Sequence, residues 1–396
     1  MTNCLYFSYD GLLDPLGQSQ VIPYIQYLAA VGHSFTIISF EKEDRSPAEI
    51  SALEQRLGEA GVEWTRLPFR SGKLEFVRRV ISGIAAVRRV CGRINPDIVH
   101  LRGFIPAVIY KLSRSRVPHL YDFRGFAVEE WAEIGKLGAD SLPHQVLRRI
   151  DRSAVETACG LVVLERSAEA LLRKTYDVPN VPLKVIRTCT DVTLYLPRKD
   201  SMASRQQGAI HFVYLGGAKR PYRPDLALRL VSQLINYGLD CRLDFLNERD
   251  HADIAAAAKD VGFPQDKMKV LRIDQKHIPR ALQEYDCGLV FLDSSLWRRV
   301  CCPTKIGEYL AAGLPVVSLE GIDVLEQFAA TTRCVEIVKQ EELMNGIGIA
   351  TIDQITALIH RLGVGSACQE LARRECSLEM AGQLYAELYA EIETRP

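Results

Sequence analysis

The sequence predicts an α/β protein built from two doubly wound, Rossmann-like domains. Short apolar segments alternate with helical patterns over residues 1–190, and a second alternation of the same kind begins at residue 210. A polar stretch rich in lysine and arginine, 197–208, separates the two series and is expected to be a linker. A length of 396 residues suits two domains, and no period of 20–50 residues indicates a repeat protein. We therefore expect domains at 1–190 and 200–376.

Composition narrows the possible classes of protein. The formal net charge is zero, so no nucleic-acid partner is expected. No apolar run approaches the length of a membrane span, and the first residues lack the basic segment of a signal peptide. The 11 cysteines form no Cys-x-x-Cys pair and no cluster with histidine at zinc spacing, which favours a reducing compartment and predicts no metal site. These features together predict a cytoplasmic location.

The first alternation places polar residues at the ends of predicted strands. Strand 5–8 leads into a loop that contains Gly17 and Gln18, followed by helix 21–30 and strand 35–40. Strand 97–101 ends at Arg102, and strand 120–122 ends at Asp122, with Arg124 two residues later. Because α/β proteins bind ligands at the carboxyl ends of their strands, these residues are candidates for one site. Buried salt bridges between them are the alternative interpretation.

A long helix is predicted at 73–94. Its apolar stripe is formed by Val77, Val80, Ile84, Val87, Cys91 and Ile94, and its remaining faces carry Arg78, Arg79, Arg88, Arg89 and Arg93. The simpler interpretation is a solvated basic face over a buried stripe. The alternative is peripheral contact with a membrane, because each basic residue near an anionic surface contributes about 1 kcal/mol.

The second alternation contains a candidate diphosphate site. Strand 210–215 is followed by Gly216 and Gly217, and then by Lys219 and Arg220, which could neutralise an anion. Gly321 begins a later helix whose first N–H groups are expected to be free.

Residues 302–318 contain the most informative pattern. A short helix is expected to start at Pro303 and Thr304 and to end at Gly313, between strands 287–292 and 315–319. Lys305 and Glu308 lie three residues apart and therefore share one face. They are either a surface ion pair or a ligand site. In the second case Lys305 holds a phosphate at the helix N-terminus and Glu308 accepts hydrogen bonds from sugar hydroxyls.

The motif resembles the donor-nucleotide motif of glycosyltransferase family 4, whose members have the GT-B fold. It reads Pro303-Thr304-Lys305-x-x-Glu308-Tyr309-x-Ala311-x-Gly313-x-Pro315-Val316. The resemblance implies sugar transfer from a nucleotide-sugar without a metal and with retention, and it matches Glu308 to the glutamate that holds the ribose. It also implies two domains facing a cleft, with a C-terminal helix at about 377–396 returning to the first. Many members carry a second glutamate eight positions earlier, where this chain has Val300.

Two further runs resemble loops of a bacterial surface-polysaccharide subgroup of that family. They are residues 14–20, which include Gly17 and Gln18, and residues 122–126, which include Asp122 and Arg124. The resemblance implies that the domain at 1–190 binds the acceptor and the domain at 200–376 binds the nucleotide-sugar. Asp122 and Arg124 are then expected to orient the acceptor. Asp122 as a general base, which would suit inversion, is the alternative.

The predicted function is hexosyl transfer from a nucleotide-sugar to a saccharide or lipid-linked saccharide in polysaccharide biosynthesis. Lys305, with Lys219 or Arg220, is expected to stabilise the leaving diphosphate. No cofactor is expected besides the nucleotide-sugar co-substrate, and a lipid-linked acceptor would place the protein at the inner face of the cytoplasmic membrane. The alternatives are a nucleotide-sugar epimerase of the same fold and a non-catalytic nucleotide-binding scaffold protein.

Overall fold

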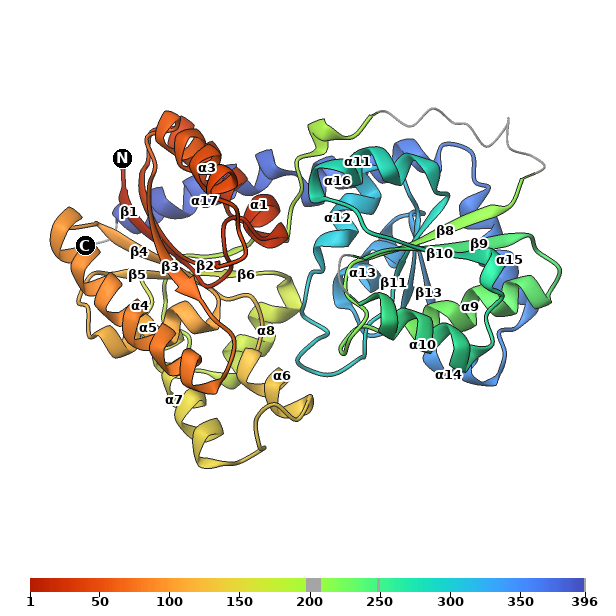
Figure 1. The fold of residues 1–396 in the computed structure, drawn as a ribbon, viewed down its shortest axis with the longest axis horizontal. Helices are drawn as coiled ribbons and strands as arrows, with labels where there is room; N and C mark the ends of the chain where they lie inside the picture. The colour runs from red at the N-terminus through yellow and green to blue at the C-terminus, as the bar shows by residue number, and fades with distance from the viewer. Residues whose placement is uncertain (197–207, 248–249, 395–396) are drawn as a thin grey trace. The chain divides into compact units, whose positions relative to one another are not determined.

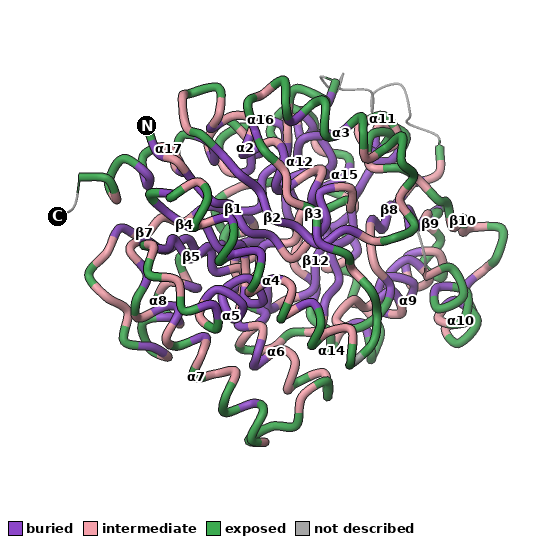
Figure 2. Tube along the Cα trace, turned by 60° about the vertical axis from the view of Figure 1, so that its left-hand side comes forward, coloured by how far each residue is buried: buried purple, intermediate pink, exposed green. Residues whose placement is uncertain are grey.

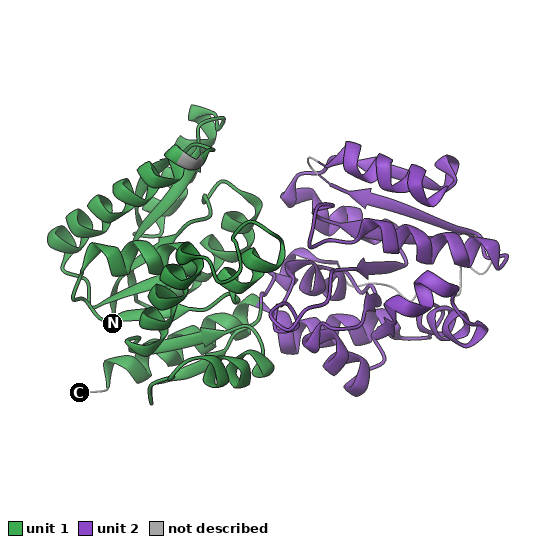
Figure 3. Ribbon diagram, turned by 90° about the horizontal axis from the view of Figure 1, so that it is seen from below, with its two compact units in different colours: residues 1–187, 378–396 green, residues 188–377 purple. Residues whose placement is uncertain are grey.

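The computed structural model describes residues 1–196, 208–247 and 250–394. The chain forms two compact units, one of Met1–Arg187 with Leu378–Pro396 and the other of Thr188–Ser377 (Figure 3). The sequence placed the corresponding boundaries at 190, 200 and 376. The predicted linker at 197–208 lies outside the described residues except for Gly208.

The first unit is built on a seven-stranded parallel sheet with the strand order β3-β2-β1-β4-β5-β6-β7. Its central strands are buried on both faces, as expected when helices cover a parallel sheet on each side (Figure 2). In chain order the strands are β1 Asn3–Ser8, β2 Ser34–Lys42, β3 Glu63–Phe69, β4 Ile98–Arg102, β5 His119–Asp122, β6 Gly160–Val163 and β7 Leu183–Val185.

Eight helices of the N-terminal segment and the C-terminal helix cover this sheet (Figure 1). They are α1 Pro15–Gln20, α2 Ile22–Ala30, α3 Pro47–Glu59, α4 Lys73–Ile94, α5 Phe104–Ser113, α6 Ala127–Glu133, α7 Leu142–Glu156, α8 Arg166–Thr175 and α17 Leu378–Glu393. Helix α17 packs against α2, where the Tyr27 ring lies so close to Gly382 that a Cβ there would meet it at 2.3 Å. Residues 15–20, predicted as a loop, form α1 because Pro15 begins a helical turn.

The buried face of α4 differs from the predicted stripe. Val77 is 53% exposed, whereas Arg79, predicted on the solvated face, is only 7% exposed. The inner face shares Val87 with the predicted stripe and otherwise runs through Gly83 and Val90. A Cβ on Gly83 would lie 3.0 Å from Ile109 of α5, so this glycine lets the two helices approach closely and sets the rotation of α4.

The second unit is built on a six-stranded parallel sheet with the order β10-β9-β8-β11-β12-β13. Its strands are β8 Ile210–Leu215, β9 Cys241–Leu246, β10 Met268–Leu271, β11 Cys287–Val290, β12 Val316–Leu319 and β13 Val335–Val338. Its helices are α9 Pro224–Asn236, α10 His251–Val261, α11 Ile278–Ala281, α12 Thr304–Ala311, α13 Asp323–Thr331, α14 Gln340–Asn345, α15 Ile349–Ile359 and α16 Val364–Cys376. Short 3-10 turns occur at Val192–Leu194, Gln265–Lys267, Gln275–His277 and Leu282–Glu284.

Both sheets are doubly wound, so each has a point where the winding direction reverses. In the first unit this point lies between β1 and β4, and in the second between β8 and β11. Ligands of such sheets bind outside the carboxyl ends of the strands at this point. Across the described ranges, no helix combines the length and apolar character needed to span a bilayer.

Tyr309 fixes helix α12 over the reversal point of the second sheet. Its hydroxyl accepts a hydrogen bond from the Leu215 backbone N–H at 2.7 Å, at the end of β8. Its ring occupies the space above Gly288 in β11, where a Cβ would meet Tyr309 Cδ2 at 2.4 Å. Glycine weakens a strand on its own, so its presence here is explained by the close approach of the ring.

We expect Gly288→Ala to lower the free energy of unfolding by about 1–3 kcal/mol, because the added methyl group overpacks the Tyr309 ring. Chemical denaturation followed by circular dichroism measures the change. Gly92→Ala is the control, because Gly92 lies in α4 with nothing within 4 Å of its Cβ position. That variant should gain about 0.5–1 kcal/mol from helix propensity. Equal stability of the Gly288→Ala variant and the parent would contradict the packing argument.

Candidate functional site

The N-terminus of α12 lies at the reversal point of the second sheet. The helix begins at Thr304. Pro303, which was predicted to be the first helical residue, is instead the N-cap residue that precedes it. No side chain caps this end, and the Ile306 N–H already donates to the Pro303 carbonyl at 3.1 Å, so the Thr304 and Lys305 N–H groups are the ones available to a ligand. Gly216, which follows β8, has a φ of +101°, and a Cβ there would lie 3.5 Å from Lys305 Nζ. The first turn of α12 and the Gly216 backbone therefore converge.

Lys305 is buried without a hydrogen-bond partner. Its residue exposure is 4%, and its Nζ lies 4.5 Å from the Tyr214 ring centroid and 4.6 Å from that of Tyr222. Within the described part of the chain, no group accepts a hydrogen bond from this Nζ. Burial lowers the pKa of Lys305 to about 7, although the charge of Glu308 acts in the opposite direction. An ammonium held between two ring faces still attracts an anion strongly.

Glu308 lies one turn further along α12 and is 5% exposed. Its Oε1 accepts a hydrogen bond from Gln275 Nε2 at 2.7 Å. Burial raises the pKa of Glu308, and the bond from Gln275 and the charge of Lys305 counteract this rise. The interpretation of Lys305 and Glu308 as a surface pair is therefore wrong, because both side chains are buried. Sequence reasoning missed Gln275, which belongs to no motif and lies 33 residues away.

The loop after β8 has little room for side chains. A Cβ on Gly217 would lie 2.9 Å from the Tyr222 ring, and the Gly216 carbonyl accepts a bond from Asn247 Nδ2 at 2.7 Å. Tyr222 itself pairs with Leu292 in an isolated antiparallel bridge. The two glycines therefore let the Tyr222 ring close over Lys305. Tyr222 was also missed from the sequence, where nothing marks it as different from other tyrosines.

The basic residues predicted beside this loop lie among carboxylates. Lys219 has a side chain 70% exposed, and its Nζ lies 3.5 Å from Asp253 Oδ2. Arg220 has a side chain 74% exposed, and its Nε donates to Asp293 Oδ2 at 2.9 Å. Arg223 Nη1 donates to the other oxygen of Asp293 at 3.0 Å. An anion would have to displace these carboxylates to bind Lys219 or Arg220. At Lys305 it would displace none, because no described carboxylate is bonded to Nζ.

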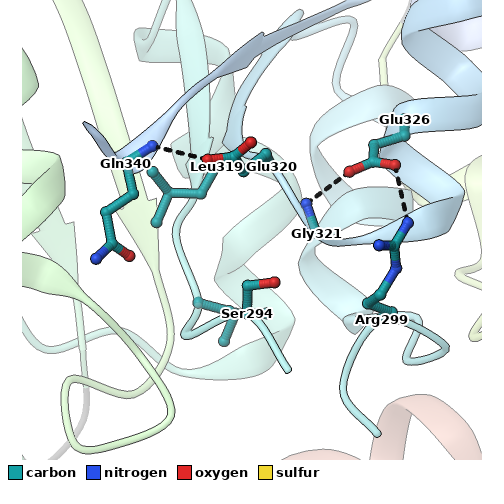
Figure 4. A pocket seen from close by; sticks show the side chains of 8 residues that line it. Ser294, Arg299, Leu319, Glu320, Gly321, Glu326 and Gln340 are labelled. Atoms are coloured by element: carbon teal, nitrogen blue, oxygen red, sulfur yellow. Dashed lines mark hydrogen bonds and ion pairs between the residues drawn. The ribbon is translucent and has the colours of Figure 1, made fainter. Parts of the chain in front are cut away.

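Gly321 borders a separate pocket of about 370 Å³ (Figure 4). Gly321 was expected to begin a helix with free N–H groups, but α13 begins at Asp323, whose N–H donates to the Arg299 carbonyl at 2.9 Å, and the Gly321 N–H donates to Glu326 Oε1 at 2.6 Å. Glu326 in turn contacts Arg299, and Glu320 accepts from the Gln340 backbone at 3.2 Å. The lining consists of Leu292, Ser294, Arg299, Leu319, Glu320, Gly321, Glu326 and Gln340. Val300, at the position of the missing glutamate, is itself buried.

Asp122 and Arg124 belong to a buried network in the first unit. Asp122 is 1% exposed; Arg124 Nη1 lies 3.4 Å from Oδ1, and Tyr385 Oη donates to Oδ2 at 3.1 Å. His100 Nε2 lies 3.7 Å from the same Oδ2. Burial acts to raise the pKa of Asp122, but the charge of Arg124, the hydrogen bond and charge of His100 and the charge of Arg102 together outweigh it and hold that pKa below its ordinary value. Asp122 is therefore a weak proton acceptor that ties Arg124 to α17.

The remaining predicted residues of the first unit hold its loops. A Cβ on Gly17 would lie 2.1 Å from the Gly11 carbonyl oxygen, so α1 packs directly on that loop. Gln18 Nε2 donates to the Leu12 carbonyl at 2.7 Å. Arg102 Nη1 contacts Asp10 Oδ2 at 2.6 Å, at the reversal point between β1 and β4. The structure thus brings Gly216, Gly217, Pro303, Thr304, Lys305 and Glu308 together, and separately joins Asp122 to Arg124. In the described ranges, no three His, Cys, Asp or Glu side chains are arranged to hold a metal ion.

Comparison with known proteins gives one family match. Residues 21–189 match the model described as "Glycosyl transferase 4-like domain". This match covers most of the first unit and none of the α12 site. No curated protein matches the chain in sequence.

Solved structures resemble the chain over nearly its whole length. A sucrose-phosphate synthase (tll1590) from Thermosynechococcus elongatus has a TM-score of 0.70 at 14% identity, covering 98% of this chain and 100% of that one. Anabaena Alr3699/HepE in complex with UDP-glucose has a TM-score of 0.69 at 14% identity, with coverages of 98% and 100%. A putative UDP-N-acetylglucosamine 2-epimerase from Listeria monocytogenes has a TM-score of 0.60 at 13% identity, with coverages of 100% and 98%. These likenesses establish the two-domain α/β fold known as GT-B.

The low pKa of Lys305 gives a stability prediction with a definite sign. Between about pH 7 and the ordinary lysine pKa, the unfolded chain binds this proton and the folded chain does not, so stability rises with pH. Lys305→Met removes that dependence. We therefore expect the variant to melt at least as high as the parent at about pH 7, and to lose ground to the parent as pH rises to about pH 9.

Melting temperatures measured across this pH range test the prediction. Lys259→Met is the matched control, because Lys259 lies exposed on α10. Its difference from the parent should not change with pH. A Lys305→Met difference that is equally flat would show that Lys305 remains charged in the folded protein.

Proposed function

Starting from the glycosyl transferase 4-like domain at residues 21–189, we propose that this chain transfers a sugar from a nucleotide-sugar to a saccharide or lipid-linked saccharide acceptor. The observation that carries the proposal is the buried Lys305 ammonium at the uncapped start of α12, which finds no hydrogen-bond partner among the residues that the structure describes. A diphosphate supplies what this position lacks, because its oxygens accept from the ammonium and from the helix N–H groups.

In this proposal Lys305 stabilises the departing nucleoside diphosphate. Negative charge develops on the leaving oxygen as the glycosidic bond breaks, and a preorganised cation in a dry site stabilises that charge. Thr304, Gly216 and Gly217 supply backbone close to the diphosphate. Lys219 or Arg220 can add positive charge there if it leaves its ion pair with Asp253 or Asp293 and binds the diphosphate instead. A cation provided by the chain makes a metal ion unnecessary for this step.

Glu308 is proposed to bind the ribose of the nucleotide. Its carboxylate already accepts one hydrogen bond, from Gln275, and an ionised carboxylate can accept several. The two ribose hydroxyls are suitable donors one helical turn from the diphosphate. The UDP-glucose bound by the Anabaena protein is an example of such a donor.

We propose retention rather than inversion. A general base must take the proton of the attacking hydroxyl, and Asp122 is poorly suited because it is buried and because Arg124, His100 and Arg102 together hold its pKa low. In a retaining reaction the leaving diphosphate itself can take that proton. Asp122 then acts by positioning Arg124, which contacts the acceptor together with residues near Arg102 and Gly17.

Polysaccharide assembly at a membrane surface completes the proposal. Helix α4 supports it with three exposed apolar residues, Leu74, Val77 and Ile81, which are 79%, 53% and 62% exposed. Arg89 is also exposed on this helix, whereas Arg78 and Arg93 already contact Glu75 and Glu63. The support therefore comes more from apolar exposure than from free positive charge.

Nucleotide binding and turnover test the proposed function. We expect Glu308→Ala to weaken nucleoside diphosphate binding roughly ten- to hundredfold, because it removes hydrogen bonds to a charged group.

Lys305→Ala should lower turnover about 10²–10³-fold by removing one preorganised electrostatic donor. EDTA should leave turnover unchanged. The measurements are calorimetric titration over a panel of nucleotides, and product formation from nucleotide-sugars with saccharide acceptors.

Glu341→Ala, in the exposed start of α14, is the control and should bind as the parent does. Unchanged affinity in a folded Glu308→Ala variant would remove the ribose assignment. Interconversion of the nucleotide-sugar without an acceptor would instead establish an epimerase. Tight binding without turnover on any acceptor would establish a scaffold protein.

A further inference from the structure

Arg79 of α4 is a buried cation in the first unit that the proposed transfer reaction does not use. It is 7% exposed, and its Nη1 has no hydrogen-bond partner among the described residues. Its Nε donates to the Tyr9 hydroxyl at 3.0 Å. The nearest acidic residue in sequence to Tyr9 is Asp10, whose carboxylate is already held by Arg102 at 2.6 Å. No carboxylate forms an ion pair with Arg79 anywhere in the described ranges.

Aromatic rings surround this guanidinium on several sides. Its Cζ lies 4.4 Å from the Phe69 ring centroid, 5.6 Å from that of Phe76 and 5.8 Å from that of Tyr9. Tyr9 also packs edge-on against Phe69, with centroids 5.8 Å apart. We call Tyr9, Phe69, Phe76 and Arg79 the aromatic cup. The three rings are only half-buried, so the cup lies close to the surface of the unit.

The cup lies at the edge of the sheet where ligands of α/β proteins bind. Tyr9 directly follows β1, Phe69 is the last residue of β3, and Arg79 is in the second turn of the helix that follows β3. These are the carboxyl ends of two strands on one side of the reversal point. The position is thus that of a ligand site rather than of the interior of the core.

The chemistry of an arginine in this setting favours an anion. Taking a guanidinium out of water is costly unless its charge and its N–H groups are matched, and ring faces match only the charge. A guanidinium stacked on an aromatic face keeps its in-plane N–H groups directed outward, in the fork geometry that fits two oxygens of a phosphate. Here Nη1 lacks the acceptor that such an oxygen would provide.

We propose that the aromatic cup binds a phosphate group through Arg79. The assignment of a phosphate site rests on the geometry of the first unit alone. The further assignment, that this phosphate belongs to the sugar acceptor as a phosphorylated saccharide or a lipid-linked one, rests on the proposed function. The cup then holds the acceptor by its phosphate end, and the Lys305 site of the second unit holds the donor.

Calorimetric titration with inorganic phosphate at low ionic strength tests the phosphate site. Arg79→Met keeps the length and the ring contacts of the side chain but removes the charge, and we expect it to weaken phosphate binding by at least about tenfold. Arg79→Lys should lie between parent and Met variant, because a point charge cannot engage two oxygens. If Arg79→Met fails to fold, weaker phosphate binding by Arg79→Lys than by the parent still tests the proposal.

Two controls separate this site from general charge and from the donor site. Arg89→Met removes one charge from the exposed face of the same helix and should leave phosphate affinity unchanged. Lys305→Met should also leave the Arg79-dependent part of binding intact. Because no turnover is measured, the outcome is independent of whether the chain proves to be a transferase.

A second titration identifies the carrier of the phosphate. Vesicles of phosphatidylcholine with and without phosphatidic acid are compared with a soluble phosphate monoester, each against the parent, Arg79→Met and Lys174→Met, which removes an exposed charge from α8 rather than from α4. Arg79-dependent binding to the phosphatidic acid vesicles supports a lipid carrier, and Arg79-dependent binding of the soluble ester alone supports a phosphorylated saccharide. Equal binding by Arg79→Met and the parent in every titration, or no binding by the parent, would overturn the proposal.

Discussion

A buried ammonium with no hydrogen-bond partner in the described part of the chain is the constraint on which the second unit depends. Lys305 lies at the positive end of α12, where the helix dipole disfavours a cation, and burial removes it from water as well. The ring faces of Tyr214 and Tyr222 and the charge of Glu308 compensate for part of this in the free protein. Such an arrangement is stable if the surrounding packing is strong enough to impose it, and it leaves the site prepared for an anion.

The surrounding packing is specified by glycines and one tyrosine. Tyr309 fixes α12 to the end of β8 through its hydroxyl, and Gly288 provides the space for its ring. Gly217 provides the space in which Tyr222 lies over Lys305. Because the Tyr309–Leu215 hydrogen bond and the contact of Tyr222 with Lys305 each join the loop or strand end at β8 to helix α12 on the other side of the reversal point, the doubly wound topology and the binding site depend on the same few residues.

Local patterns in the sequence were enough to predict helix ends that depend on the backbone preferences of one or two residues. The start of α12 was placed within one residue, because Pro303 and Gly313 limit the helix in ways that depend on their own backbone preferences. Contacts between distant segments were not predictable. Gln275 contacts Glu308, and Tyr222 contacts Lys305, only because the tertiary fold brings distant segments together. The Gly321 N–H likewise donates to Glu326, a hydrogen bond that no local pattern indicates. The buried face of α4 is rotated by about one residue from the predicted stripe. Val77 is exposed, whereas Gly83 packs against Ile109 of α5.

Proton uptake on nucleotide binding is the most direct measure of the central claim, that the unpartnered Lys305 ammonium is the diphosphate site. Burial lowers its pKa to about 7, so at about pH 8 the free protein holds it mostly neutral, and a bound diphosphate must restore its proton. Calorimetric titration of a nucleoside diphosphate in buffers of different ionisation enthalpy measures this uptake. The account predicts an uptake approaching one proton per nucleotide in the parent and none in Lys305→Met. Binding without uptake in the parent, or equal uptake in both proteins, would contradict it.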